Sequence, residues 1–520
     1  MVNFSFVNVS GFPKLGWVAS LDRAQNCLQV MHGESVEVNG SWCVEGVWDG
    51  EFEQGEFHLS ENFFGSGVAV LHDKLVFAPS CATVDRICFC EVGNCVVVSN
   101  SLLLLLSAID GRLIDRSYKK EINSIRNGIE RFERMIPVDH AEVDYVQQVI
   151  HENLVFSGSE IRFESRSKRH NLDSFEDYEG RLKQILKQIL SNVESPSRHK
   201  EISTYSTISR GYDSTAVTAV VKDLGVDTGF TCPRSNSPWW MGKLASSDDG
   251  TPIASALGMN TIHIGTGKSI EHETELLLLA GTPLAPELVF HDMCNHIEGN
   301  DSAAVVFTGY HGDKLWDVST SGRYISDQIL RGDISGIGLT EARLKSGFIN
   351  VPITFIFARD IEDIVKISNS PEMQTWRTNN SYDRPIPRRI LELAGVPGKL
   401  FGMRKKAVLN NDLFPMSRDL KREYVDFLRQ GVSWSRAYVR AMELLQTASY
   451  YQIRVSTYLR FKNAHSKSGK SVRFLSQLKP EARRFSWAVN RSCLQLTERT
   501  NIQSLLNLSL IHISEPTRPY

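Results

Sequence analysis

Residues 202–221, ISTYSTISRGYDSTAVTAVV, contain the pattern that decides the fold of this chain. The first seven of them are mostly β-branched or aromatic, which favours a β-strand. Small, polar and charged residues then fill 209–214. From Thr215 to Leu224 the pattern predicts a helix, which Gly225 ends. A strand, a short turn and a helix are therefore expected to follow one another directly.

Strands and helices continue to alternate after this stretch, and one helix precedes it. Ser174 is placed to cap a helix whose apolar side chains recur at helical spacing from Tyr178 to Val193. Beyond Gly225 we expect strands at 228–232, 260–264 and 303–307, and helices at 252–257, 271–280 and 288–297. This alternation predicts an α/β fold, with a parallel sheet flanked by helices on both faces. Ligands on such sheets bind at the carboxyl ends of the strands.

The first part of the chain has a different pattern. Short apolar runs alternate there with turn signals such as His72-Asp73 and Gly93-Asn94, which predicts β structure. We expect a β-rich domain at 1–170, an α/β domain at 171–465 and a C-terminal extension at 466–520. Residues 510–520 look like a translated sequencing-adapter read, so we expect them to be artefactual and poorly packed.

Composition argues against several classes of protein. The chain has 58 Lys plus Arg against 60 Asp plus Glu, and this near balance gives no reason to expect nucleic acid or an anionic membrane as a partner. The longest apolar run is far shorter than the ~20 residues of a membrane-spanning helix. There are nine cysteines and no CxxC pair, which favours reduced thiols and a cytoplasmic location.

The loop at 209–214 has the features of a phosphate-binding turn. Helix N-termini present free N–H groups to anions, and Gly211 allows close approach of the backbone. Ser209 and Ser214 can donate hydroxyl hydrogens to phosphate oxygens. Asp213 can lie near a phosphate if Mg²⁺ lies between them. A plain turn with a helix cap would use the same residue types, so this loop alone leaves both interpretations open.

A second loop, TGYHGD at 308–313, follows the apolar strand predicted at 303–307. Thr308 supplies a hydroxyl, Gly309 and Gly312 allow close approach, and Asp313 supplies one carboxylate. Two such loops suit one task, in which Asp213 and Asp313 bridge to phosphates through metal. The chain therefore has a candidate site for a magnesium-bound nucleotide.

Both loops also resemble a known family. SRGYDS at 209–214 resembles the SGGxDS pyrophosphatase loop of the asparagine synthetase superfamily, and TGYHGD resembles its second motif, SGxGxDE. Arg404-Lys405-Lys406 resembles the family's RxK, which matches the functional lysine to Lys406, with Lys405 as the alternative. The resemblance covers roughly residues 175–465.

The resemblance implies an adenine nucleotide α-hydrolase-like synthetase domain that binds ATP and Mg²⁺. In that family a carboxylate attacks the α-phosphate, pyrophosphate leaves, and an amine displaces AMP to give an amide. The family's lysine, here Lys406, contacts the phosphates and the reacting centre. Related cyclising enzymes, the β-lactam synthetases and lasso-peptide cyclases, use a tyrosine–glutamate pair to take the amine proton, so Tyr310 is predicted to be catalytic. The β-rich domain resembles a degenerate Ntn glutaminase domain.

The chain departs from the family pattern at several positions. Arg210 replaces a glycine, Tyr310 replaces a glutamate, and Lys314 replaces an acid. Val2 stands where a glutamine-using enzyme has its cysteine nucleophile, so we do not expect ammonia from glutamine. The expected substrates are a small-molecule or peptide carboxylate and an amine or free ammonia, and a homodimer is an assembly left open.

Two alternative functions remain open at this stage. One is a catalytically silent relative that binds a nucleotide or a partner protein in a biosynthetic complex. The other is a sulfur-transferring pyrophosphatase acting on tRNA, which would need a cysteine near the loops, and Cys232 is the candidate. The arginine-rich segment 383–389 also has two interpretations, a salt-bridged helix start or an anion clamp.

Overall fold

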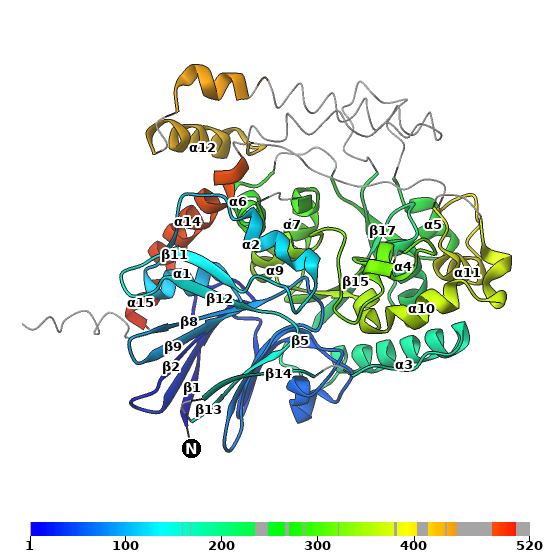
Figure 1. The fold of residues 1–520 in the computed structure, drawn as a ribbon, viewed down its shortest axis with the longest axis horizontal. Helices are drawn as coiled ribbons and strands as arrows, with labels where there is room; N and C mark the ends of the chain where they lie inside the picture. Colours follow the sequence, from blue (N-terminus) through cyan, green and yellow to red (C-terminus); the bar gives the residue numbers. More distant parts are fainter. Residues whose placement is uncertain are drawn as a thin grey trace, which may run out of the picture.

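The computed structural model describes residues 2–158, 160–166, 168–233, 248–265, 270–283, 286–320, 322–378, 382–402, 414–431, 434–442, 444 and 481–505. A β-rich half and an α/β half lie side by side (Figure 1). The predicted Lys406, its alternative Lys405 and the segment 510–520 lie outside the described residues.

The β-rich half contains two sheets that face each other across an apolar core. One has the order β1-β3-β2-β9-β8-β12-β11-β10 and the other the order β14-β13-β7-β6-β5-β4. Side chains from both, such as Val30 and Phe77, share one core cluster. The strands are β1 (Asn3–Asn8), β2 (Trp17–Asp22), β3 (Cys27–His32), β4 (Glu37–Asn39), β5 (Trp42–Val47), β6 (Phe64–Val70), β7 (Leu75–Ala78), β8 (Ile87–Val92), β9 (Cys95–Ser99), β10 (Arg112–Leu113), β11 (Met135–Asp139), β12 (Tyr145–Val149), β13 (Asn153–Ser157) and β14 (Glu160–Glu164).

The α/β half is built on a parallel sheet with the order β17-β16-β15-β18-β19. Its strands are β15 (Ile202–Ile208), β16 (Thr228–Thr231), β17 (Asn260–His263), β18 (Ala303–Thr308) and β19 (Phe348–Pro352). The predicted α/β class with a parallel sheet, together with a β-rich N-terminal region, is confirmed. The edge strand β19 was not predicted, because its short apolar run has no distinctive spacing.

Helices cover both faces of this sheet, as alternate residues of β18 demonstrate. Val305 and Phe307 pack in one core cluster with residues of the helices α3, α4, α10 and α11, whereas Ala304 and Val306 pack in another with residues of α6, α7 and α9. The bounds are α3 (Phe175–Val193), α4 (Asp213–Lys222), α6 (His272–Gly281), α7 (His291–Asn300), α9 (Thr340–Ser346), α10 (Ile361–Ser368) and α11 (Pro385–Leu393).

Most predicted helices are present with shifted ends. Ser174 caps α3, and its side chain accepts from the N–H of Asp177. The helix predicted to begin at Thr215 begins at Asp213, so Asp213 lies in its first turn. The helix predicted at 288–297 is a 3₁₀ turn over Pro286–Phe290 followed by α7. The remaining helices are α1 (Leu102–Ile109), α2 (Lys119–Asn123), α5 (Thr251–Ala256), α8 (Gly312–Leu315), α12 (Arg418–Gln430), α14 (Glu481–Thr500) and α15 (Ile502–Leu505).

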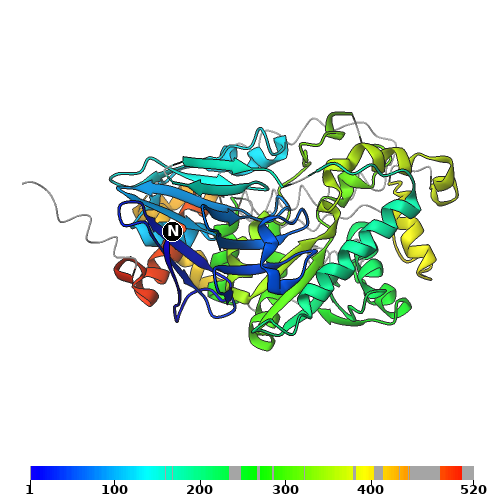
Figure 2. The same cartoon turned by 90° about the horizontal axis from the view of Figure 1, so that it is seen from below.

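The last long helix, α14, packs against the β-rich half although it is far from it in sequence (Figures 1 and 2). Asn490 on α14 exchanges two hydrogen bonds with the backbone of Leu113 on β10, at 2.8 and 2.9 Å. Ser107 on α1 donates to the carbonyl of Cys493 at 3.3 Å. Among the helices of the described ranges, none combines the length and the apolarity that a bilayer crossing needs.

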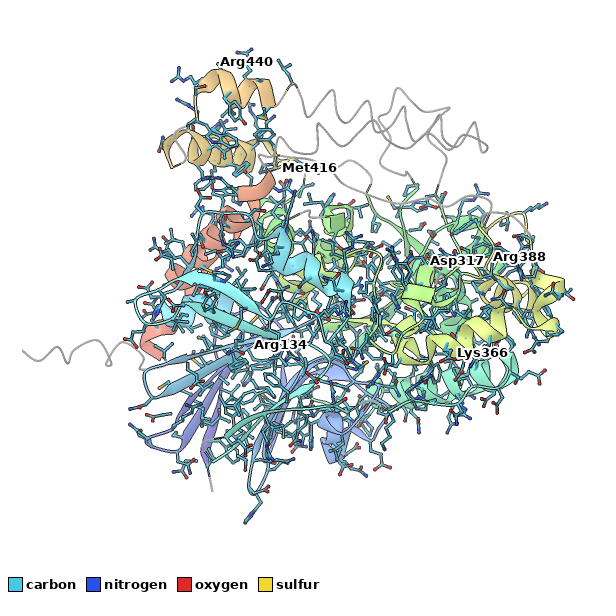
Figure 3. All side chains as sticks on the ribbon, viewed as in Figure 1. Arg134, Asp317, Lys366, Arg388, Met416 and Arg440 are labelled. Atoms are coloured by element: carbon cyan, nitrogen blue, oxygen red, sulfur yellow. The ribbon has the colours of Figure 1, made fainter. Side chains whose placement is uncertain are left out.

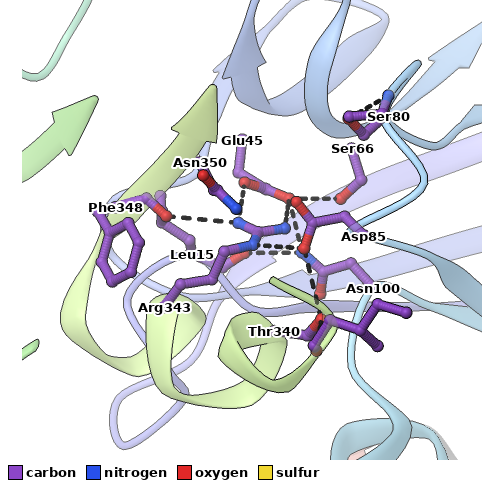
Figure 4. Close-up of polar contacts among 12 residues, drawn as sticks. Leu15, Glu45, Ser66, Ser80, Asp85, Asn100, Thr340, Arg343, Phe348 and Asn350 are labelled. Atoms are coloured by element: carbon purple, nitrogen blue, oxygen red, sulfur yellow. Dashed lines mark hydrogen bonds and ion pairs between the residues drawn. The ribbon is translucent and has the colours of Figure 1, made fainter. Parts of the chain in front are cut away.

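A buried ion-pair network joins the two halves (Figure 4). Arg343, on α9, donates to both oxygens of Glu45 on β5 at 2.9 and 3.0 Å, and to Asp85 at 2.7 Å. Ser66 donates to Glu45 from the neighbouring strand, at 2.7 Å. All three charged side chains are almost fully buried. The α/β half is therefore held against the sheets by paired charge as well as by apolar contact.

Candidate functional site

The two predicted loops meet at one edge of the parallel sheet. They follow β15 and β18, which are neighbours and run parallel, with Ser206 opposite Phe307. A Cβ atom on Gly309 would lie 2.6 Å from the backbone of Asp213 and Ser214, and one on Gly312 would lie 2.9 Å from the Asp213 carboxylate. The glycines of the second loop thus let it pack directly against the first.

The first loop is held by its own hydroxyl groups. The Oγ atoms of Ser209 and Ser214 are 2.9 Å apart, and the N–H of Gly211 donates to Ser209 Oγ at 3.1 Å. The N–H of Arg210 donates to Asp248, and its side chain donates to the carbonyl of Leu400. Because α4 begins at Asp213, the N–H groups of its first turn are directed towards this loop.

The described chain reaches the first loop again at Gly402. Its N–H donates to the carbonyl of Arg210 at 3.0 Å, and a Cβ there would lie 2.2 Å from the ring of Tyr212. The close approach, at a φ of 65°, explains why a glycine stands here. Gly402 is the last described residue before the segment that contains Lys406.

The two aspartates of the predicted metal site both have cationic partners. Asp213 accepts from Arg384, which stands at the start of α11, and Asp313 pairs with Lys314 at 2.8 Å. Asp317, one turn beyond Asp313, lies 3.5 Å from Arg384 Nε. Burial lowers the pKa of Arg384, but the adjacent Asp213 carboxylate outweighs this effect and the pKa is raised. Three carboxylates and two cations therefore lie together where the loops meet.

Tyr310 and Thr308 are directed into the protein. The Thr308 hydroxyl donates to Asn350 on β19 at 2.8 Å. The ring of Tyr310 packs against Gly336, where a Cβ would lie 3.0 Å from it. Its phenol oxygen is buried, and no residue of the described chain forms a hydrogen bond with it. Burial, and next the charge of Glu287, raise the pKa of Tyr310 well above its usual value.

Glu287 is the carboxylate next to this tyrosine. Its Oε1 accepts from the N–H of Gly336 at 2.6 Å, while Oε2 is buried without a hydrogen-bond partner among the described residues. Burial raises the pKa of Glu287 to about 7. The Tyr310 phenol and the Glu287 carboxyl group, whose pKa is near 7, therefore both lie next to Gly336.

The surroundings of His311 indicate a structural role. It adopts a φ of 75°, which is rare outside glycine, and its ring stacks on Phe355 with 5.1 Å between centroids. Burial lowers its pKa to about 4, so the ring is neutral at pH 7. Together with Gly312 it forms the tight turn that lies against the Asp213 carboxylate.

Sequence reasoning missed Asp317 and Glu287, and it included Arg384 only as one of several arginines at 383–389. The several arginines at 383–389 suggested an anion clamp, but the sequence did not indicate which of them lies in the site. Asp317 had a weak signal, because it is a second acid only four residues after Asp313, although α8 ends before it at Leu315. Glu287 had none, because a single acid before an apolar run is common on helical surfaces.

The described residues fit a magnesium ion that arrives with a nucleotide. Mg²⁺ in nucleotide sites is usually held by one or two carboxylates plus phosphate oxygens, and Asp213 and Asp313 supply the carboxylates. Within the described ranges, no group of three or more His, Cys, Asp or Glu side chains could hold a metal by itself. The protein thus offers part of a coordination shell, and phosphate oxygens would have to supply the rest.

Cys232, the candidate for sulfur transfer, follows β16 at the same edge of the sheet and is half-buried. A Cβ on Gly265 would lie 2.7 Å from its sulfur, so the thiol packs under the loop that follows β17.

Compared with known proteins, this chain matches no protein-family model and no curated relative. The resemblance stated above therefore rests on the motifs at 209–214, 308–313 and 404–406.

Proposed function

We propose that the chain is an ATP-dependent, AMP-forming ligase that adenylates a carboxylate and transfers the acyl group to an amine. The observation that carries the proposal is the contact between the two loops, each with one aspartate, at the carboxyl ends of adjacent parallel strands. On the same basis we propose that the α/β half is an adenine nucleotide α-hydrolase-like domain and the β-rich half a degenerate glutaminase-like domain. We expect the protein to act in the cytoplasm.

The residues of the site have separable tasks in this reaction. Ser209, Ser214 and the first N–H groups of α4 would bind the triphosphate, since hydroxyl and helix-terminal donors stabilise phosphate oxygens. Asp213 and Asp313 would hold Mg²⁺, which supplies neutralisation of the charge that gathers on pyrophosphate. Lys406 remains the predicted cation for the reacting centre.

The transfer step needs a group that takes a proton from the attacking amine. The nitrogen forms a bond to the acyl carbon, the bond from that carbon to the AMP oxygen breaks, and the nitrogen loses a proton. Tyr310 and Glu287 support this step, because Tyr310 is part of the second loop, Glu287 lies beside it, and both have an oxygen without a hydrogen-bond partner in the described chain. A carboxyl group with a pKa near 7 is well suited to accept a proton at neutral pH.

The defining test of the ligase is exchange of labelled pyrophosphate into ATP with Mg²⁺ and a panel of carboxylic acids. We expect at least one acid to support exchange, and Asp213→Asn or Asp313→Asn to reduce it by roughly 100-fold or more, the order found when a charge-stabilising group is removed. Asp426→Asn is a matched control, because Asp426 is on α12, half-exposed, and pairs with Arg429 on the same helix. Exchange that survives both site substitutions would contradict the assignment.

A separate experiment isolates Tyr310. Tyr310→Phe removes a buried hydroxyl that lacks a partner, so the protein should fold at least as stably as the wild type. We expect pyrophosphate exchange to be retained and amide formation to fall by roughly 100-fold, within the range of general acid–base catalysis. Equal loss of both half-reactions would place Tyr310 in nucleotide binding instead.

One observation favours the second candidate, a catalytically silent relative. Each aspartate of the loops has a cationic partner from the chain itself, Arg384 or Lys314, which reduces the charge available for a metal. ATP binding without exchange across a broad panel of acids would support this alternative.

A further inference from the structure

Arg384 occupies a position that the reaction outlined above does not explain. It directly precedes α11, and its side chain is completely buried, with the guanidinium 4.8 Å from the centre of the Tyr382 ring. Asp213 accepts a hydrogen bond from it across 171 positions of sequence. A buried arginine is therefore held beside the carboxylate that the first loop would offer to a metal.

The guanidinium is surrounded by more negative charge than this single pair. Its Nε lies 3.5 Å from Asp317, and the charge of Asp313 also acts on it. Figure 3 labels Asp317 and Arg388 in the α/β half, on the side where α4 and α11 lie. Arg384 thus supplies positive charge close to three carboxylates.

Two of its nitrogens have hydrogen-bonding capacity that the described residues leave unused. Nε and Nη2 are buried, and neither forms a hydrogen bond with any residue of the described chain. An arginine offers five N–H donors in a planar fork that matches phosphate geometry. An incoming phosphate oxygen would satisfy buried donors that form no hydrogen bond with the described residues.

We infer that Arg384 is an exchangeable counter-cation, which neutralises Asp213 in the nucleotide-free chain and passes to a phosphate oxygen when a divalent cation takes over Asp213. Asp213 then has a cationic partner both before and after binding. A free divalent ion has to displace Arg384 without compensation, whereas an ion that arrives with ATP brings a new partner for the guanidinium. This inference rests on the proposed nucleotide site. It adds that the divalent ion binds together with ATP and not before it.

The first test measures Mn²⁺ binding without nucleotide, by electron paramagnetic resonance of the free ion. Wild-type protein should bind Mn²⁺ weakly, and Arg384→Gln should bind it at least tenfold more tightly, because the ion no longer has to displace Arg384 from Asp213. Arg181→Gln is the control, because Arg181 pairs with Asp177 on the same helix, α3, and should leave Mn²⁺ affinity unchanged. Unchanged Mn²⁺ affinity in Arg384→Gln would overturn the inference.

The second test uses metal-free ATP in the presence of EDTA. Asp213→Asn should bind it at least tenfold more tightly than the wild type, because Arg384 is released for a phosphate. Loss of a metal ligand alone predicts no such gain, so an unchanged or weaker affinity would overturn the exchange. Arg384→Lys, which keeps the charge without the fork, should retain weak Mn²⁺ binding and lose at least tenfold in MgATP affinity; it provides a readout if Arg384→Gln fails to fold.

Both tests are binding measurements without an acid substrate. The inference can therefore fail while pyrophosphate exchange succeeds, and it can hold in a chain that binds ATP without adenylating anything.

Discussion

At the scale of single residues, buried polar atoms around the second loop have no hydrogen-bond partner within the described chain. They are Tyr310 Oη, Glu287 Oε2, His311 Nε2, Asn350 Nδ2 and Arg331 Nε. Native proteins leave few such atoms, since each costs about 1–3 kcal/mol. Their concentration beside the proposed site is the pattern expected where a ligand completes the hydrogen bonding.

Glu287 leads to a prediction about stability and pH. Its pKa is raised to about 7 in the folded chain, so the folded state holds a proton that the unfolded state releases near pH 4.5. Stability should therefore fall as pH rises from about 4.5 through 7, by roughly 3 kcal/mol in all at 1.36 kcal/mol per pKa unit. Glu287→Gln should remove this decline and raise the melting temperature at pH 8.

Melting temperatures measured from pH 5 to pH 9 test this prediction. Glu91→Gln, at a half-exposed residue paired with Arg23, serves as the control. If the Glu287→Gln and wild-type profiles run parallel, Glu287 does not titrate in this range.

At the scale of elements, the site depends on how closely the turn after β18 packs on the start of α4. Gly309 is the closest point, and its hypothetical Cβ would lie 2.6 Å from two backbone atoms of the first loop. A backbone cannot rotate aside as a side chain can, so the two loops would have to separate. Because Gly309 has no side chain, the loop that carries Asp313 can lie against the loop that carries Asp213.

Gly309→Ala should therefore disturb the site more than the fold. We expect a loss of about 1–3 kcal/mol in unfolding free energy from overpacking. ATP affinity should fall by roughly tenfold, equivalent to 1.4 kcal/mol. Gly180→Ala is the matched control, because a Cβ there meets nothing within 4 Å and an exposed helical position gains about 1 kcal/mol from alanine. Equal ATP binding by the two variants would contradict the close-packing argument.

Sequence patterns were most successful in predicting individual helices and strands. Strand 202–208 has the bounds of β15, and Ser174 caps α3 as expected. The start of α4 was placed two residues late, because Asp213 and Ser214 have turn propensity and their helical state depends on packing against the second loop. Local preference could not supply that contact.

At the scale of the whole molecule, the two halves are joined through Arg343, Glu45 and Asp85. A buried pair that loses one partner leaves an uncompensated charge, which is among the most destabilising changes known. Here one arginine pairs with two carboxylates of the opposite half. The β-rich half is therefore attached to α9, one of the helices that cover the parallel sheet.

Arg343→Met should destabilise the chain by about 3–5 kcal/mol, because Glu45 and Asp85 would remain buried without their cation. Urea unfolding followed by tryptophan fluorescence measures the change. Lys366→Met removes a surface cation whose side chain is 66% exposed and should change stability by less than about 0.5 kcal/mol. A small effect of Arg343→Met would mean that other contacts between the halves, such as those of Glu341 with Ser101 and Leu102, are sufficient to hold them.

The sequence alone determined the alternation of strand and helix, the parallel sheet and the two loops with their aspartates, because these depend on preferences and spacings that act over a few residues. Tertiary structure alone decided that β15 and β18 are neighbours, that Arg384 pairs with Asp213, and that Glu287 lies beside Tyr310. Such partners are brought together by the packing of whole helices and strands, and packing depends on volume and burial summed over many side chains. No short stretch of sequence carries that information.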